Sequence, residues 1–233
     1  MTIVEHLGEF RRRFMICLAA IVVGGIVCFI LSPKIISFLV EFYQNAVKDP
    51  NKKLNFLGPL DAFATRLKIA TYGGIVLALP VWLYQLWRFI TPGLNPKERK
   101  YAIPFVLSSI VLFLFGGVVA LLTLEPALKF LLNIGGADLS PQLTADKYLS
   151  LVALMIVAFG AAFEFPVVLM FLLLARVLTT KKLREWRRWA IIGIFVFAAV
   201  ITPSQDPYSL FAMAIPMYVF YESTIVIGRL LKR

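Results

Sequence analysis

Glu164 is an acidic residue in the middle of a long apolar stretch, within the sequence FGAAFEFPVV. An ionised carboxylate near the centre of a bilayer costs roughly 2.5–3.5 kcal/mol on insertion scales, so this side chain must face protein or a water-filled hollow. Pro166 has no N–H group, so it leaves the carbonyl of Ala162 free beside the acid. The pattern predicts a polar site inside a membrane. A structural glutamate, charged or protonated, that ties helices together is the alternative interpretation.

Two further carboxylates lie outside the apolar stretches and next to basic residues. Glu9 precedes a run of three arginines that ends at Arg13, and Glu98 has Lys97 and Lys100 as close neighbours. A carboxylate binds a guanidinium group through paired, charge-assisted hydrogen bonds, so two such acids could receive two arginines from a partner. Each acid could instead pair within the chain, Glu9 with Arg13 and Glu98 with either lysine.

Nothing else in the sequence has the spacing of a catalytic, cofactor-binding or metal-binding motif. His6 is the single histidine, and no cysteine cluster accompanies it. Cys17 and Cys28 are about three helical turns apart, about 16 Å along a helix axis, which is too far for a disulfide. We find no phosphate-binding glycine loop, nucleophile elbow or zinc motif. We therefore expect a protein that is not an enzyme and that uses no cofactor and no metal ion.

The elements that must position these residues are membrane-spanning helices. Hydrophobic residues make up 60% of the 233 positions and charged residues only 16%, which is typical of a polytopic membrane protein. The apolar stretches are continuous rather than alternating, which favours helices over strands. We predict an all-α membrane protein with six transmembrane helices in a single domain, residues 1–233. The predicted spans cover about residues 14–31, 62–87, 103–124, 148–175, 190–201 and 208–227.

Several local features accompany these spans. We expect an amphipathic helix over residues 1–13 and, over Lys34–Val47, a helix lying along the outer membrane surface. Pro80 should kink the second span. The last two spans have only twelve clearly apolar residues each, Ala190–Ile201 and Leu210–Tyr221. Such a stretch is about 18 Å long and falls short of the hydrocarbon thickness, so the bilayer should thin there or another subunit should cover the mismatch.

The net charge of +11 reflects membrane topology. With the N-terminus in the cytoplasm, 16 of the 24 Lys and Arg residues fall in cytoplasmic segments, as the positive-inside rule expects. Both termini are therefore predicted to be cytoplasmic, and nucleic-acid binding is not indicated. The most basic segment, Arg176–Trp189, is interpreted as a topogenic loop rather than a binding patch. Glu222 should reach the membrane interface or pair with Arg229.

Four stretches, in this order, together resemble the TatC family, the receptor subunit of the twin-arginine protein translocase. They are HLGEFRRR, YQLWRFITPGLNPKERK, FGAAFEFPV and AIPMYVFYE. The resemblance implies six spans in a curved, glove-like bundle in the cell inner (plasma) membrane. It also implies a cytoplasmic site for the twin-arginine signal peptide of folded precursor proteins. By this resemblance, Glu9 and Glu98 fall on acidic contact positions, and neighbouring contact positions fall on Arg11, Phe89, Leu94 and Arg99.

The resemblance further implies partners and an energy source. Single-span TatA- and TatB-type subunits, and further TatC copies, would assemble with the chain, and the proton-motive force would drive transport. The partners would dock against the two short final spans. The candidate contacts there are Thr202, Leu210 and Glu222, and Leu210 stands where the family usually has a glutamine.

Two functions of other classes remain as alternatives. A secondary transporter could use Glu164 as an intramembrane proton or ion carrier, but Glu164 is the only acid well inside any predicted span. A structural membrane scaffold would tolerate neutral substitutions at Glu98. Binding of a twin-arginine peptide separates the receptor from both.

Overall fold

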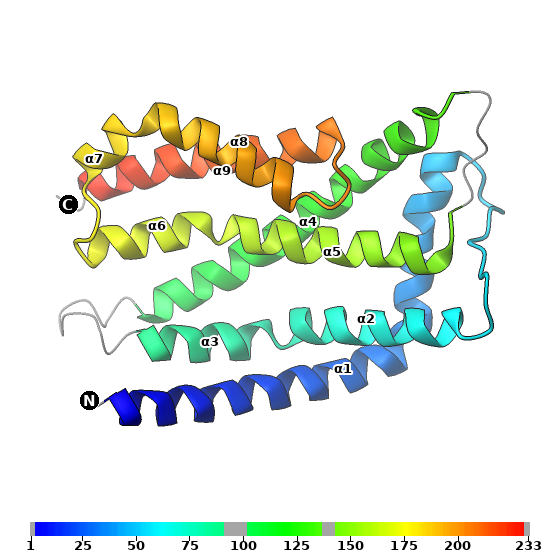
Figure 1. The fold of residues 1–233 in the computed structure, drawn as a ribbon, viewed down its shortest axis with the longest axis horizontal. Helices are drawn as coiled ribbons and strands as arrows, with labels where there is room; N and C mark the ends of the chain where they lie inside the picture. Colours follow the sequence, from blue (N-terminus) through cyan, green and yellow to red (C-terminus); the bar gives the residue numbers. More distant parts are fainter. Residues whose placement is uncertain (1–2, 91–101, 137–142, 231–233) are drawn as a thin grey trace.

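The computed structural model describes residues 3–90, 102–136 and 143–230, and the regular secondary structure in these ranges is helical (Figure 1). An isolated bridge between Asn55 and Thr144 is the one β-type pairing among the described residues. The predicted all-α fold is confirmed. The helices are α1 (Ile3–Val47), α2 (Asp61–Leu77), α3 (Leu79–Ile90), α4 (Ala102–Asn133), α5 (Ala145–Phe163), α6 (Phe165–Leu174), α7 (Thr180–Glu185), α8 (Arg187–Ile201) and α9 (Pro207–Leu230).

Several helical segments in the described ranges are long and apolar enough to cross a membrane. Four do so as single segments, and α2 with α3 makes a fifth if the bent pair counts as one span. The single segments are Glu5–Val47, Ile103–Asn133, Ala145–Leu174 and Pro207–Leu230. The predicted short span at Ala190–Ile201 coincides with α8, whose 15 residues amount to about 22 Å and fall below this length requirement.

The second predicted span is sharply broken. α2 ends at Leu77, α3 begins at Leu79, and the two helices are bent by 51°. Pro80 lies in the first turn of α3, where its missing N–H removes no helical hydrogen bond. Ala78 between the helices is buried, and its N–H still reaches the carbonyl of Gly74 at 2.9 Å. The kink predicted near Pro80 is confirmed.

α1 is a single helix of 45 residues with Pro33 inside it, although we predicted three separate segments over this range. The helix turns in its second half (Figure 1). This half carries Leu39 and Tyr43, which are buried in the main apolar core together with residues of α4 and α5. Tyr148 of α5 donates a hydrogen bond to the carbonyl of Leu39 at 2.6 Å. The helical periodicity of Lys34–Val47, which we assigned to a helix lying on the membrane surface, is therefore explained by packing against α4 and α5.

α9 corrects the prediction of a short last span. The helix has 24 residues, about 36 Å, and continues beyond the twelve apolar residues at both ends. Polar residues within these ends are covered by protein: Ser209 and Thr224 are buried, and Glu222 is paired with Arg187. The helix therefore covers the whole predicted span, residues 208–227, and the twelve apolar residues are only its central part.

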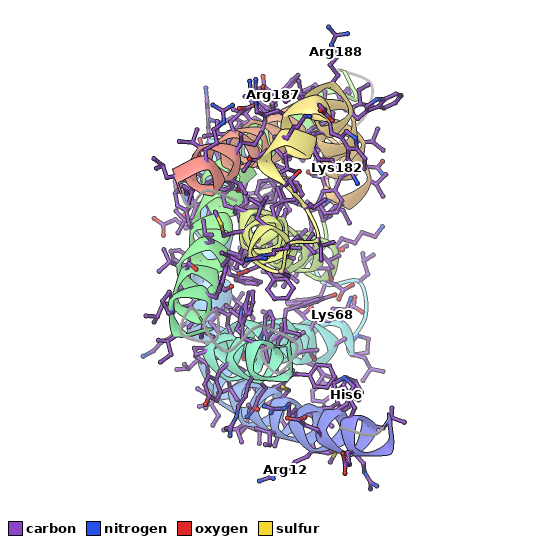
Figure 2. All side chains as sticks on the ribbon, turned by 90° about the vertical axis from the view of Figure 1, so that its left-hand side faces the viewer. His6, Arg12, Lys68, Lys182, Arg187 and Arg188 are labelled. Carbon is purple, nitrogen blue, oxygen red and sulfur yellow. The ribbon has the colours of Figure 1, made fainter. Side chains whose placement is uncertain are left out.

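α4 holds the bundle together. It crosses behind the other helices and contacts α1, α3, α5, α6 and α9 (Figure 1). Figure 2, viewed onto the end where α1 begins and α9 ends, shows α1 at one edge of the molecule and α7 to α9 at the other. Glycines allow the closest contacts. A Cβ at Gly116 of α4 would lie 2.6 Å from the carbonyl oxygen of Phe159 in α5.

α1 and α2 approach each other in the same way. A Cβ at Gly74 would lie 2.7 Å from the backbone N of Gly25 and 2.7 Å from the carbonyl oxygen of Ile21. In a bilayer, helices gain little from burying apolar surface against each other, so small residues that allow close packing drive association. The α1–α2 contact therefore requires glycine at this position.

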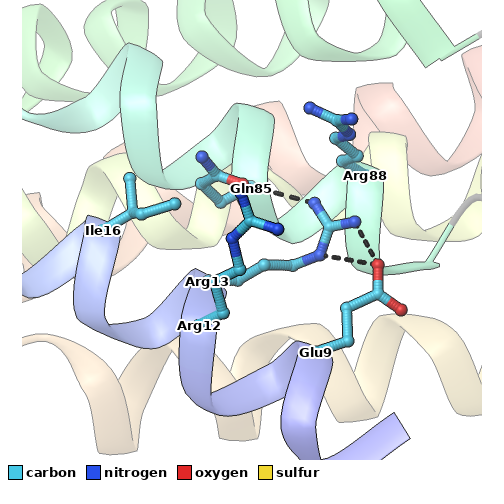
Figure 3. A pocket seen from close by; sticks show the side chains of 6 residues that line it. All are labelled: Glu9, Arg12, Arg13, Ile16, Gln85 and Arg88. Atoms are coloured by element: carbon cyan, nitrogen blue, oxygen red, sulfur yellow. Dashed lines mark hydrogen bonds and ion pairs between the residues drawn. The ribbon is translucent and has the colours of Figure 1, made fainter. Parts of the chain in front are cut away.

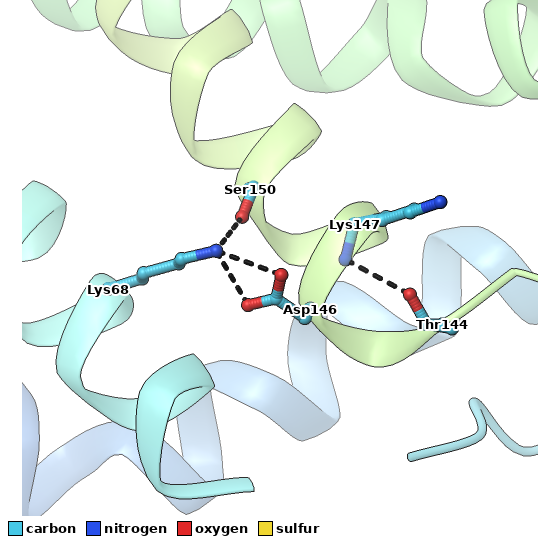
Figure 4. Close-up of polar contacts among 5 residues, drawn as sticks. All are labelled: Lys68, Thr144, Asp146, Lys147 and Ser150. Carbon is cyan, nitrogen blue, oxygen red and sulfur yellow. Dashed lines mark hydrogen bonds and ion pairs between the residues drawn. The ribbon is translucent and has the colours of Figure 1, made fainter. Parts of the chain in front are cut away.

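An ion pair ties α2 to α5 near the opposite end of the molecule, where both helices begin (Figure 4). Lys68 Nζ lies 2.7 Å and 2.9 Å from the two carboxylate oxygens of Asp146 and 3.2 Å from Ser150 Oγ. Thr144 caps α5 by accepting a hydrogen bond from the backbone N of Lys147 at 3.4 Å. The ion pair is partly exposed, so it contributes at most about 1 kcal/mol and mainly sets the register of the two helices.

We predict that Gly74→Ala destabilises the protein, because the new methyl group meets backbone that cannot rotate away. The expected loss is about 1–3 kcal/mol in the free energy of unfolding, seen as a lower melting temperature in detergent. Gly193→Ala in α8 is the matched control, since a Cβ there meets nothing within 4 Å. The control should melt at the native temperature or slightly above, because alanine favours helix. Equal melting of the two variants would contradict the packing role of Gly74.

Candidate functional site

The start of α1 and the end of α3 enclose a polar pocket of about 210 Å³ (Figure 3). Its lining residues are Glu9, Arg12, Arg13, Ile16, Gln85 and Arg88. Arg13 is held from two sides: its Nε donates to Glu9 Oε1 at 3.0 Å, and its Nη1 donates to Gln85 Oε1 at 3.3 Å. Its Nη2 also contacts Glu9 Oε1. The predicted pairing of Glu9 with Arg13 within the chain is confirmed.

One oxygen of Glu9 nevertheless remains available. Oε2 is buried and has no hydrogen-bond partner among the described residues. A buried acceptor without a partner costs free energy, and the cost is larger when the acceptor is charged. A carboxylate can accept from more than one guanidinium group, so Glu9 can hold Arg13 and still receive a second donor.

The charge of this pocket sets a further requirement. Among the described residues that line it, Glu9 is the one carboxylate against three arginines, so these residues alone would repel a cation. A cationic ligand therefore needs a second acid near the pocket. Glu98, the acid predicted for this role, lies outside the described residues, as do Leu94 and Arg99.

An apolar pocket of about 330 Å³ adjoins the polar one and shares Arg13 and Gln85 with it. Its remaining lining residues are Phe10, Phe14, Cys17, Trp82, Leu86 and Phe89. Phe89 is half-buried and packs against α1, with ring centroids 4.4 Å from His6 and 5.7 Å from Phe10. Of the predicted residues, Glu9 and Phe89 thus lie at neighbouring pockets, whereas Arg11 is exposed and lines neither.

Apart from Phe89, sequence reasoning missed the residues that α3 contributes to the two pockets. Trp82, Gln85 and Phe89 follow one another at spacings of three and four residues, which places them on one face of a helix. That face meets the first turns of α1. The spacing was visible in the sequence, but its significance depends on the pairing of α3 with α1.

Glu164 forms a second polar site, at the break between α5 and α6. Its carbonyl accepts hydrogen bonds from the N–H groups of Val167 at 3.0 Å and Val168 at 3.1 Å, and Pro166 lies in the first turn of α6. The side chain is half-buried, and Oε1 is shielded from solvent without a partner among the described residues. The interruption of helical hydrogen bonding that we predicted at Pro166 is therefore seen as the break where α5 ends and α6 begins.

Two residues from other helices surround this acid. Ser109 of α4 is fully buried, and its side chain lies close to the Glu164 carboxyl group. Ser109 Oγ also accepts from the indole N–H of Trp87 in α3, at 3.3 Å. Polar groups of α3 and α4 thus lie beside the α5–α6 break. Sequence reasoning missed Ser109 and Trp87, because a lone serine and a lone tryptophan have no distinctive spacing.

Comparison with known proteins decides the family. The profile described as "Sec-independent protein translocase protein (TatC)" matches residues 5–216. The chain belongs to the TatC family. TatC proteins are components of the Sec-independent protein translocase, and the apolar helices of this TatC-family chain agree with a membrane protein of the Tat system.

Individual relatives agree with this assignment. The chain is 45% identical to TatC of Frankia casuarinae over 98% of its own length, and it spans 65% of that relative. It is 36% identical to TatC of Carboxydothermus hydrogenoformans over its full length, and it spans 94% of that relative. A crystal structure titled "Twin Arginine Translocase Receptor- TatC" superimposes with a TM-score of 0.79 at 37% identity, covering 98% of this chain and all of the other.

The three candidate partner contacts of this TatC-family chain do not form one site. Thr202 is buried and donates its hydroxyl to the carbonyl of Ala198 at 2.6 Å, and Leu210 is half-buried. Glu222 lies twelve residues beyond Leu210 in α9, about 18 Å along the axis. Its carboxylate lies 2.5 Å from Arg187 Nη2 and 3.3 Å from the Tyr218 hydroxyl. The predicted pairing of Glu222 with Arg229 is wrong, because α8 offers an arginine directly opposite.

We predict that Ser109→Ala destabilises this TatC-family chain by about 1–3 kcal/mol, because it leaves the buried indole N–H of Trp87 without its acceptor. Melting temperature in detergent is the measurement. Ser108→Ala is the matched control: its hydroxyl is exposed and bonds the carbonyl of Pro104 in its own helix, at 2.8 Å. The control should change stability by less than about 0.5 kcal/mol. A native melting temperature in Ser109→Ala would mean that the hydrogen bond between Trp87 and Ser109 contributes nothing to stability.

Proposed function

We propose that this TatC-family chain is the receptor of the twin-arginine translocation system. It binds the twin-arginine signal peptide of folded precursor proteins at its cytoplasmic face. The observation that carries the proposal is the unpartnered carboxylate oxygen of Glu9 in a polar pocket that adjoins an apolar one. A signal peptide matches these two pockets, because its basic segment, suited to the polar pocket, is followed by an apolar segment suited to the apolar pocket.

In this proposal the two arginines of the signal are received by Glu9 and Glu98. Glu98 adds a second negative charge to a pocket in which three arginines outnumber Glu9, and each acid offers an acceptor to one guanidinium group of the signal. In this proposal Arg11, Phe89, Leu94 and Arg99 supply further contacts to the signal, and the apolar pocket lined by Phe89 takes its first apolar residues. Lysine keeps the charge of arginine but lacks its planar fork, so a receptor of this kind discriminates between the two.

We further propose that the chain lies in the inner membrane of the cell and that α8 is its sixth span. Both termini then face the cytoplasm. Two observations support this topology: α1 begins and α9 ends at the same end of the molecule, and α8 runs alongside α9 (Figure 1). TatA- and TatB-type subunits, and further TatC copies, assemble on the receptor. Transport is then driven by the proton-motive force.

Binding of a twin-arginine signal peptide to the purified protein in detergent tests the site. The native protein should bind the Arg-Arg peptide and lose most of that affinity for a Lys-Lys peptide. Glu98→Ala should abolish binding while the protein stays folded. Glu9→Gln should weaken it by about ten- to a hundred-fold, the loss expected for a charge-assisted hydrogen bond.

Glu41→Gln is the control for these variants, because it removes an exposed acid from the second half of α1. It should bind as the native protein does, and all three variants should elute and melt as native. Normal binding in Glu98→Ala would refute the assignment of the site. Binding that is equally weak for the Arg-Arg and Lys-Lys peptides would mean that the isolated chain lacks part of the receptor.

Glu164→Ala should act at a later step, because Glu164 lies at a helix break distant in sequence from the polar pocket. Peptide binding in detergent should stay within about two-fold of native, a difference of less than 0.5 kcal/mol. Transport of a folded precursor into membrane vesicles, or assembly with TatA- and TatB-type subunits, should be impaired. Loss of peptide binding in this variant would show that the two sites are not separate.

A further inference from the structure

The segment Arg176–Trp189, which the sequence suggests is a topogenic loop, is an ordered structure at the end of the molecule where α1 begins and α9 ends (Figure 1). We call it the basic segment. It contains α7 and the first turn of α8. Thr179 caps α7 by accepting from the backbone N of Lys182 at 3.3 Å. Leu183 is buried, and its carbonyl accepts a hydrogen bond from the Tyr221 hydroxyl of α9 at 2.6 Å. The segment is thus fastened to the bundle.

Most of its cations point away from the protein. Arg187 is half-buried and paired with Glu222, which fixes the start of α8 on α9. The other five basic residues are exposed: Arg176, Lys181, Lys182, Arg184 and Arg188. Figure 2 shows Lys182 and Arg188 on one edge of the molecule, far from Arg12 at the other edge. Glu185 is the one acidic residue in the segment, so its exposed surface is strongly positive.

Two indoles lie among these cations. Trp186 is 51% exposed and Trp189 is 74% exposed, although tryptophan is usually well covered in a folded protein. Lys182 Nζ lies 4.9 Å from the ring centroid of Trp186. Exposed indoles beside lysine and arginine are characteristic of the membrane–water interface, where the ring meets apolar chains and the cation meets phosphate. An acidic protein in water would give these rings no comparable environment.

With α8 as the sixth span, as proposed above, its length places this surface at the bilayer. The helix begins at Arg187 and covers only about 22 Å, so its first turn cannot extend far beyond the hydrocarbon. Arg187 and Arg188 also occupy a helix N-terminus, where positive charge opposes the helix dipole and an anion is favoured. The position at the membrane surface and the dipole of α8 therefore both favour an anion beside the first turn of α8.

We propose that the basic segment is a binding site for anionic phospholipid headgroups of the membrane. The phosphates contact Lys181, Lys182, Arg184 and Arg188, and the indoles of Trp186 and Trp189 enter the interface beside them. Basic clusters directly beside a transmembrane helix bind anionic lipid in this way. Bound lipid anchors α7 and α8, the elements that fasten onto α9 through Leu183 and Arg187.

Lipid titration of the purified full chain in detergent, followed by native mass spectrometry, tests this proposal. Phosphatidylglycerol and phosphatidylcholine of the same acyl chains are compared. The quadruple variant Lys181→Gln/Lys182→Gln/Arg184→Gln/Arg188→Gln removes four charges from the basic segment. The control Lys34→Gln/Lys48→Gln/Lys52→Gln/Lys53→Gln removes four exposed charges elsewhere and leaves the same net charge.

The native chain and the control should bind phosphatidylglycerol about ten-fold or more tightly than phosphatidylcholine, given the attraction of each basic residue to an anionic surface. The quadruple variant should lose this preference and still melt as native. Equal binding of the two lipids by the native chain, an unchanged preference in the quadruple variant, or an equal loss in the control would each overturn the proposal. An octaglutamate peptide is the competing probe. Its binding through these four residues, without a lipid preference, would assign the surface to an acidic polypeptide instead.

Discussion

Within the hydrocarbon of a bilayer there is no water to satisfy a polar group, so each buried donor or acceptor must find its partner in the protein. Two helix breaks in the described part of the chain meet that constraint for the backbone, since the N–H groups of Ala78 and Glu164 both keep a carbonyl acceptor, whereas Glu164 Oε1 has none there. At Ala78 and at Glu164 the backbone leaves regular geometry, and both residues lie against neighbouring helices rather than facing lipid alone. Ser109 of α4 lies beside Glu164, and its hydroxyl accepts a hydrogen bond from the Trp87 indole of α3. The position of α4 across the bundle therefore also determines which polar groups lie beside Glu164.

The same constraint explains how much the sequence could predict. Long apolar runs and internal prolines were enough to predict the helices, the kink near Pro80 and the interruption near Pro166. They did not predict that α1 continues through Pro33, since the apolar face of Lys34–Val47 looks alike whether it packs on lipid or on protein. Nor could they show that Glu222 pairs with Arg187, 35 positions away, because helical periodicity reports only neighbours three or four residues apart.

The candidate binding surface was predictable to a similar degree. Glu9 and Phe89 were expected there, and the pairing of Glu9 with Arg13 follows from their spacing on a helix. The structure adds Gln85 and Arg88, which line the same pocket as Glu9 because α3 packs beside α1. Pairing between helices also decides the charge of the pocket, and with it the need for a second acid. Individual residues could thus be chosen from the sequence, whereas the balance of charge among them is a property of the fold.

The glycine contacts of α4 and α5 affect how genetic data on such a protein are interpreted. A Cβ at Gly160 would lie 2.6 Å from the ring of Phe113, and one at Gly116 would meet the backbone of Phe159. Random mutagenesis scored by transport would therefore recover these glycines as strongly as residues that touch a substrate. Because neither glycine carries a functional group, such hits would report on the amount of assembled protein in the membrane. Measuring that amount alongside transport separates residues that build the bundle from residues that use it.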